Sequence, residues 1–265
     1  MSKDSVAEPI YNSIGKTYDV TRKADPIITQ TIIKHLCPKQ NKKYLDLGCG
    51  SGNYTGALNS KGISIDGVDV SSEMLGKAKI KYPNIQWHKG DARQLPFQAE
   101  SYDGAICILA THHIKNITAA FQEAFRVISH GKFVIFTAAP EQYHQYWLGE
   151  YFPKMIENEC KVMTSLEKIT YALSHAGFKN IDSEPFFVTN DLQDLFLYAG
   201  KYRPEIYLNP DIRAGISSFH VSSYEEEITL GLANLELDIR SGKIQKIIQE
   251  SENRSGDYLF VFAEK

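Results

Sequence analysis

The chain has 265 residues, with 29 Lys and Arg against 32 Asp and Glu, and a formal net charge of -3. At roughly 150 residues per domain, this length fits one large domain or two small ones, and it can bury a core without disulfide or metal staples. The near-neutral charge lacks the strongly basic footprint of a nucleic-acid-binding protein, although it leaves room for a local basic patch. Aromatic residues make up 11% of the chain, which argues against disorder.

Short segments and the cysteine spacing predict the cellular compartment and whether the chain spans a membrane. Residues 1–9 mix charged residues with no apolar run, so no signal peptide is visible. The apolar stretches at 105–110 and 133–139 are far shorter than the ~20 residues of a membrane-spanning helix. The four cysteines form no CxxC pair and have no zinc-finger spacing. We therefore expect a cytoplasmic protein without a membrane partner and without a metal.

The first half of the chain alternates strand and helix patterns. Strand-like runs cover residues 43–47, 63–70, 85–88, 102–109 and 132–137. Asp25-Pro26 is a typical helix start, and Ser71 caps a second helix. Strands that alternate with helices predict βαβ crossovers and a mostly parallel sheet covered on both faces. The fold class is therefore α/β, a doubly wound Rossmann-like sheet.

The second half is less regular. We expect a helix over 166–175 that stops at Gly177, a sixth strand at 181–188 and a seventh at 258–263. About 70 residues of mainly helical pattern lie between these two strands. One apolar helix face is predicted from four side chains there, namely Leu192, Leu195, Phe196 and Ala199. We interpret this stretch as an insertion between two strands of one sheet.

Residues 44–52, YLDLGCGSG, carry the main chemical signal. A strand runs into alternating glycines and then a helix, so the backbone can turn sharply and a ligand can approach the helix N-terminus. The dinucleotide fingerprint GxGxxG fails, because Asn53 stands where its third glycine belongs. A phosphate loop ending at Gly15-Lys16-Thr17 also fails, because Ile10 replaces its first glycine.

GxGxG after an acidic strand residue is a third class of loop, and Asp46 to Gly52 resembles motif I of the class I S-adenosylmethionine-dependent methyltransferases. The resemblance covers residues 44–136 in order. Asp69 ends the second strand, Gly90-Asp91-Ala92 resembles the third signature, and residues 101–104 lead into the fourth strand. Ser129-His130-Gly131 departs from the usual proline and paired glycines before the fifth strand. The ubiquinone-biosynthesis-like branch, methyltransferase type 11, is the most similar.

This resemblance implies S-adenosylmethionine as cofactor and gives several residues a role. Asp69 would accept hydrogen bonds from both ribose hydroxyls, and Asp91 would contact the adenine amino group. Asp46 would receive loop amides while lying near the methionine amine. Further cofactor contacts are expected from Gly48, Gly50, Gly52, Val70, Met74, Ala92 and Ile108. Taken singly, each aspartate could be an ordinary cap or turn residue, so the interpretation depends on the ordered set.

The resemblance also implies a domain organisation. Residues 1–265 would form one methyltransferase domain, with N-terminal cover helices in 1–40 and a cofactor core in 41–140. Variable substrate-side elements would occupy 141–180 and 190–256, and the last strand would be antiparallel. From the cover helices, Arg22 would pair with the methionine carboxylate, since its planar fork suits a carboxylate, and Tyr18 would close over the cofactor. An exposed surface position is the alternative for Arg22.

Methyl transfer from a sulfonium has a neutral leaving group, so alignment of the nucleophile is the main requirement. A general base is needed only when the nucleophile must lose a proton early. His112 and His113 follow the fourth strand, beside the expected methyl group, and we predict that they act as a base or position the acceptor. Capping and packing of the loop is the alternative.

Aromatic residues after the fifth strand predict the acceptor side. Tyr143, Tyr146 and Trp147, with Tyr11, are the candidate substrate contacts, and an aromatic wall suits an apolar or planar small molecule. Residues 203–205 and 213–220 would form a lid. The same aromatics could instead be core between the insertion and the sheet.

The expected reaction is methyl transfer to an oxygen, nitrogen or carbon atom of a small molecule. A tRNA or protein methyltransferase and a non-catalytic cofactor-binding protein remain alternatives, although the net charge disfavours nucleic acid. Arsenite methyltransferases share the fold but use essential cysteines, and Cys49 and Cys107 are better explained structurally. The oligomeric state is left open.

Overall fold

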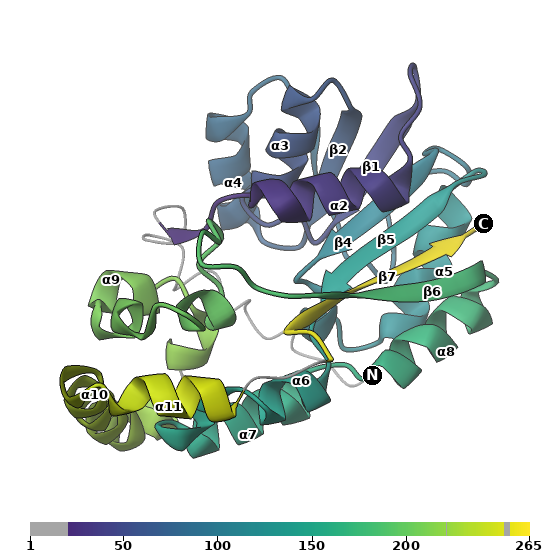
Figure 1. The fold of residues 1–265 in the computed structure, drawn as a ribbon. Coiled ribbons are helices and arrows are strands. Elements are labelled where there is room, and N and C mark those ends of the chain that lie inside the picture. The colour runs from purple at the N-terminus through teal and green to yellow at the C-terminus, as the bar shows by residue number, and fades with distance from the viewer. Residues whose placement is uncertain (1–20, 221, 252–254) are drawn as a thin grey trace, which may run out of the picture.

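The computed structural model describes residues 21–220, 222–251 and 255–265, and these contain a seven-stranded sheet (Figure 1). The strands are β1 Lys43–Leu47, β2 Ser64–Asp69, β3 Trp87–Lys89, β4 Gly104–Ile108, β5 Lys132–Thr137, β6 Lys179–Phe186 and β7 Tyr258–Glu264. Their order is β3-β2-β1-β4-β5-β7-β6. All neighbouring pairs are parallel except those of β7, which is antiparallel to β5 and β6. The predicted fold class is confirmed.

Helices cover both faces of the sheet. They are α2 Pro26–Leu36, α3 Asn53–Ser60, α4 Ser72–Lys81, α5 Ile117–Val127, α6 Pro140–His144, α7 Pro153–Val162, α8 Leu166–Ala176, α9 Pro210–Arg213, α10 Glu225–Ser241 and α11 Lys243–Glu250. Figure 1 shows α2 across one face and α5 and α8 across the other. Helices α6, α7 and α9–α11 lie together beyond the sheet, on the side to which β4 and β5 point.

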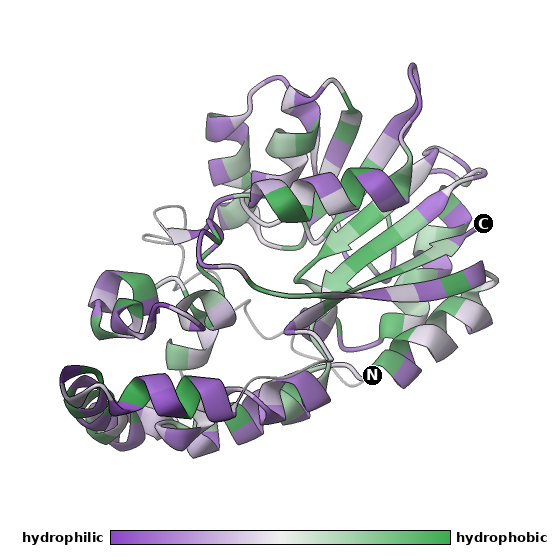
Figure 2. Ribbon diagram, in the orientation of Figure 1, coloured by the Kyte–Doolittle hydropathy of each residue, from purple (hydrophilic) through white to green (hydrophobic). Residues whose placement is uncertain are grey.

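The core has two apolar layers, one on each side of the sheet. Ile32 of α2 and Phe136 of β5 belong to one layer, and Phe121 of α5 and Phe133 of β5 belong to the other. Because successive residues of β5 point to opposite faces, both faces need apolar side chains. Figure 2 shows this as continuous apolar colour along β4 and β5, whereas α10 and α11 alternate polar and apolar residues.

Local signals in the sequence place the helix ends. The Asp25 carboxylate accepts hydrogen bonds from the amides of Ile27 and Ile28 and caps α2. Ser71 caps α4 in the same way through the Met74 amide. Gly177 ends α8 with φ of 107°, a conformation that favours glycine. These predicted starts and stops are confirmed.

One predicted helix is wrong. The four apolar residues at 192–199 do not share a helical face, because residues 187–196 contain no helix and a short 3-10 helix, Leu197–Gly200, follows. The backbone there bonds to distant groups instead, with the Gln193 amide donating to the Asp25 carboxylate and the Leu195 amide donating to the Thr21 carbonyl. Long-range contacts therefore override the local helical pattern.

Within the described residues, no helix is long and apolar enough to span a membrane.

Candidate functional site

The glycine loop joins β1 to α3 at the carboxyl edge of the sheet. Gly48, Gly50 and Gly52 have φ of 70°, 53° and 79°, in the left-handed region that favours glycine. A Cβ on Gly48 would lie 2.7 Å from the Cβ of Ala110, and one on Gly52 would overlap the ring of Trp87. The three glycines therefore allow both the turn and the close packing of neighbouring elements around it.

Asp46 on β1 lies beneath this loop with 2% of its surface exposed. Its Oδ2 accepts a hydrogen bond of 2.6 Å from the Thr55 hydroxyl, not from loop amides as expected. Its Oδ1 is buried and has no partner among the described residues. Burial raises the pKa of Asp46 to about 7, and the nearby Asp69 charge adds to the shift. An unsatisfied buried acceptor of this kind is suited to a cationic ligand.

Asp69 ends β2 and holds the glycine loop. Its Oδ2 accepts from the Gly50 amide and its Oδ1 from the Ser71 amide, both at 2.8 Å. Burial raises the pKa of this carboxyl, and the backbone amides oppose that shift. Because a carboxylate has about four acceptor positions, both oxygens can still receive hydroxyl donors. The geometry fits a vicinal diol such as ribose.

Other predicted cofactor residues surround the same edge. Met74 is buried on α4, with its Cε 3.5 Å from the position that a Cβ on Gly50 would occupy. Ile108 is buried at the end of β4, whereas Val70 is 45% exposed beside Asp69. These placements bring the side chains of β1, β2, α4 and β4 to one edge of the sheet.

Asp91 follows β3, close to Ala92, and is held by its own loop. The Arg93 guanidinium pairs with the Asp91 carboxylate, with Nη2 at 2.6 Å from Oδ2, and the Arg93 amide donates to Oδ1. These contacts lower the pKa of the Asp91 carboxyl. The role of Asp91 toward adenine stays a prediction, and the sequence pattern did not identify Arg93.

Comparison with known proteins identifies the family. Residues 45–136 match the family of methyltransferase domains. The crystal structure of a putative methyltransferase from an antibiotic biosynthesis pathway of Anabaena variabilis is 32% identical to this chain, with a TM-score of 0.83 over 92% of this chain and 98% of that one. The chain belongs to the class I S-adenosylmethionine-dependent methyltransferases.

Curated relatives are more distant. The demethylmenaquinone methyltransferase of Chlorobaculum parvum is 24% identical over 56% of this chain and 70% of that protein. The malonyl-[acyl-carrier protein] O-methyltransferase of Erwinia billingiae is 25% identical over 55% of this chain and 58% of that protein. The match therefore spans little more than half of the second relative.

The residues of this methyltransferase fit the cofactor that the family uses. Asp46 offers a buried acceptor without a partner for the methionine ammonium group, and Asp69 offers a carboxylate for the ribose. Gly50, which has no side chain, leaves the centre of the loop open to the ligand. These three features fit the cofactor, and the contacts of Asp46 and Asp69 with it stay predictions.

Arg22 lies near this edge, whereas Tyr11 and Tyr18 fall outside the described residues. The Arg22 Nε is 2.5 Å from Asp194 Oδ1, and its Nη2 is 3.3 Å from Asp194 Oδ2. Its carbonyl accepts from the Asn53 side-chain amide at the start of α3. Arg22 is therefore paired rather than an exposed surface residue, and its contact with the methionine carboxylate stays a prediction.

His112 and His113 form a turn after β4. Their ring centroids are 3.8 Å apart, and the buried Nδ1 of His112 has no partner among the described residues. Burial and the charges of His113 and Arg22 lower the pKa of His112 well below its ordinary value. The pKa of His113 shifts in the same direction, although this residue is exposed and solvent screens part of the effect. At neutral pH His112 is thus uncharged.

The three predicted aromatic substrate contacts are buried. Tyr143, Tyr146 and Trp147 are 3%, 4% and 2% exposed. The Tyr143 hydroxyl bonds to Tyr258, the Tyr146 hydroxyl bonds to Tyr207, and the Trp147 indole donates to a backbone carbonyl. The structure therefore places them in the core between the sheet and the insertion. Their contact with an acceptor stays a prediction.

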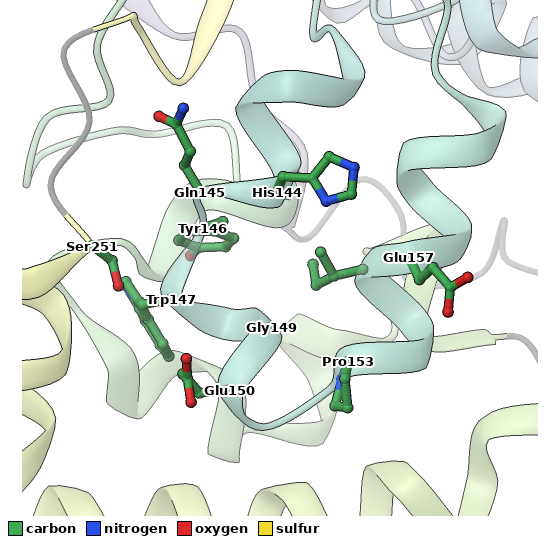
Figure 3. A pocket seen from close by; sticks show the side chains of 10 residues that line it. His144, Gln145, Tyr146, Trp147, Gly149, Glu150, Pro153, Glu157 and Ser251 are labelled. Atoms are coloured by element: carbon green, nitrogen blue, oxygen red, sulfur yellow. The ribbon is translucent and has the colours of Figure 1, made fainter.

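Figure 3 shows a surface pocket that two of these aromatics also border. It lies between α6, the 3-10 helix Trp147–Glu150 and α7, and Ser251 completes its wall. No residue of the glycine loop, Asp69 or His112 lines it. Methyl transfer requires contact between acceptor and cofactor, so this pocket is not assigned to the acceptor.

Proposed function

We propose that this methyltransferase transfers a methyl group to an oxygen, nitrogen or carbon atom of a small molecule by in-line displacement. The observation that carries the proposal is a pair of buried polar atoms that find no partner among residues 21–220, 222–251 and 255–265, namely Asp46 Oδ1 and His112 Nδ1. The first lies on β1 and the second follows β4, and these strands are neighbours in the sheet. A ligand that completes both must enter the fold at this edge.

The roles of the chain follow from these positions. S-adenosylmethionine supplies a methyl group on a sulfonium, whose leaving group is neutral. Asp46 and Arg22 would hold the amino and carboxylate groups of its methionine part, and Asp69 would fix the ribose. Holding two reacting groups in this way lowers the activation free energy of their reaction by up to about 7–11 kcal/mol.

His112 would act mainly on the acceptor. A neutral imidazole nitrogen accepts a hydrogen bond, so Nδ1 can orient a hydroxyl or amine donor. The lowered pKa makes His112 a weak base. We therefore favour positioning by His112 over early proton removal. The turn is fixed for this task, because the Thr111 hydroxyl is 2.9 Å from the Thr137 hydroxyl of β5.

The choice of a small molecule has two supports. The relatives named above act on demethylmenaquinone and on malonyl groups of acyl-carrier protein. The chain also has a net charge of -3, which disfavours a polyanion such as tRNA.

The test uses methyl-labelled S-adenosylmethionine in separate reactions with a metabolite extract, with a panel of quinols, carboxylic acids and amines, with total tRNA and with total cell protein. We expect label in a small molecule and none with the Asp69→Ala variant. Label in tRNA or protein would instead establish the macromolecular alternative. Cofactor binding without transfer to any acceptor would establish the non-catalytic alternative.

A further inference from the structure

The insertion reaches back to the cofactor site through residues 187–196. This segment contacts Thr21 and Asp25 through the two backbone hydrogen bonds described above. Gly215 of the insertion also approaches closely, because a Cβ there would overlap the Thr21 hydroxyl. The segment that carries Arg22 is therefore held between the insertion and α3.

Asp194 is the charged residue at the centre of this contact. It is 2% exposed, and its two oxygens face Nε and Nη2 of Arg22. The Tyr54 hydroxyl donates to Asp194 Oδ2 at 3.1 Å. Burying a charge is costly unless it is paired and hydrogen-bonded, and apolar replacements of buried ion pairs are often no less stable. The pair is thus better explained by orientation of Arg22 than by stability.

Arg22 lies next to the start of α3. Asn53 and Tyr54, which contact Arg22 and Asp194, are the first residues of α3 after Gly52. The Arg22 charge also acts on His112 after β4. The guanidinium therefore lies beside the start of α3, next to the glycine loop.

We propose that Asp194 is a positioning residue that fixes the Arg22 guanidinium for the methionine carboxylate of the cofactor. The inference rests on the proposed contact of Arg22 with that carboxylate. Two-point pairing sets the plane of the guanidinium, and its five N–H donors allow it to serve a second carboxylate. Fixing the group beforehand reduces the entropy lost when the cofactor binds. In this way the insertion contributes to the cofactor site from a distance of 172 residues along the chain.

The test compares two ligands by calorimetry, S-adenosylmethionine and its decarboxylated analogue. Asp194→Asn keeps the shape and removes the charge, and we expect about tenfold weaker binding of S-adenosylmethionine, from the loss of a charge-assisted hydrogen bond. Binding of the analogue should stay within about twofold of wild type. Asp191→Asn, in the same segment, is the matched control and should change neither affinity.

Two further variants distinguish a positioning role of Asp194 from a general folding defect. Tyr54→Phe removes another contact of Asp194 and should weaken S-adenosylmethionine alone, by about threefold. In the Arg22→Ala background, Asp194→Asn should have no additional effect, because the two residues act as a unit. Equal losses for both ligands, an unchanged affinity or tighter binding of S-adenosylmethionine would overturn the proposal. The proposed acceptor class is read separately, from the labelled product of the wild-type protein.

Discussion

Two regions that meet at the carboxyl edge of the sheet differ in whether their buried polar atoms have hydrogen-bond partners. In the first, the cofactor region around β1 and the turn after β4, Asp46 Oδ1 and His112 Nδ1 have no partner among the described residues. In the aromatic region, the hydroxyls of Tyr146 and Tyr207 bond to each other, and the Arg203 Nε is the one unpaired buried group there in the part of the chain that the structure describes.

This difference separates binding from packing. Buried polar groups are normally paired within the protein, so an unpaired one at a ligand-facing edge indicates that a ligand completes it. A paired one, such as the Trp147 indole on the Lys201 carbonyl, is already satisfied by folding. From this comparison we expect ligand contacts in the first region and structural roles in the second.

Gly50→Ala should give the largest effect. Both Gly50 and Gly62 have positive φ, so alanine strains the backbone at either position by about 1–2 kcal/mol. A Cβ on Gly50 would lie 3.5 Å from Cε of Met74, itself a predicted cofactor contact, whereas one on Gly62 meets nothing within 4 Å. We expect about a hundredfold weaker cofactor binding for Gly50→Ala, by calorimetry, from steric overlap. Gly62→Ala is the control, and an equal loss in both variants would contradict a ligand role for Gly50.

The cofactor region could be predicted from the sequence because its signals are local. The glycine loop, Asp69 and the Ser71 cap lie within short, contiguous segments whose local chemistry limits the structure. The five strands of the first half also follow from the alternation of strand and helix patterns, with only their ends shifted. The third strand, for example, is Trp87–Lys89 rather than 85–88.

Other features depend on contacts that the sequence does not reveal. Asp194 meets Arg22 across 172 residues, and a local pattern predicted a helix at that point. Thr55 replaces loop amides as the partner of Asp46, although both lie in the matched segment. Aromatic residues in a core and in a binding wall have the same composition, so Tyr143 and Trp147 could not be assigned before their burial was known.

Tyr207→Phe should test the aromatic region. The Tyr207 hydroxyl donates to the Leu197 carbonyl, accepts from the Gly200 amide and contacts the Tyr146 hydroxyl. Its removal leaves buried groups unpaired, so we expect a loss of about 2 kcal/mol in the free energy of unfolding, measured with urea. Cofactor affinity should not change.

Tyr146→Phe is the matched variant, because the hydroxyl of Tyr207 then keeps its bond to Leu197. The expected loss of unfolding free energy is about 1 kcal/mol. If Tyr146→Phe lowers kcat/KM for the acceptor under conditions where the variant stays folded, Tyr146 contacts the acceptor. The separation of the two regions would then fail.

His112→Leu should reduce kcat/KM by about tenfold, since leucine removes the ring nitrogen that would orient the acceptor and puts no polar atom in its place. Essential general bases contribute about 10²–10⁴-fold, so a loss in that range would favour proton removal instead. His113→Leu is the neighbouring control, at a residue with an exposed ring. If turnover of the double variant equals that of wild type, neither histidine acts on the acceptor.

The smallest effect concerns the proton on Asp46. Its pKa in the folded chain is about 7, above the ordinary 3.8, so between these values the folded state holds more protons than the unfolded state. The contribution of Asp46 to stability therefore falls as pH rises through that window and is constant above it. An ammonium group favours the charged carboxylate, and cofactor binding should release this proton.

At pH 7 about half of the Asp46 side chains carry the proton, so we expect release of about half a proton per bound cofactor. Release should approach one proton near pH 5.5 and decrease as the pH rises above 7. Calorimetry in two buffers of different ionisation enthalpy measures it directly. Asp69 also has a raised pKa, but a ribose hydroxyl does not require its ionisation, so Asp46→Asn should abolish the release. If proton release persists in this variant, Asp69 is the group that loses the proton. The proposed contact between Asp46 and the ammonium group of the cofactor would then be wrong.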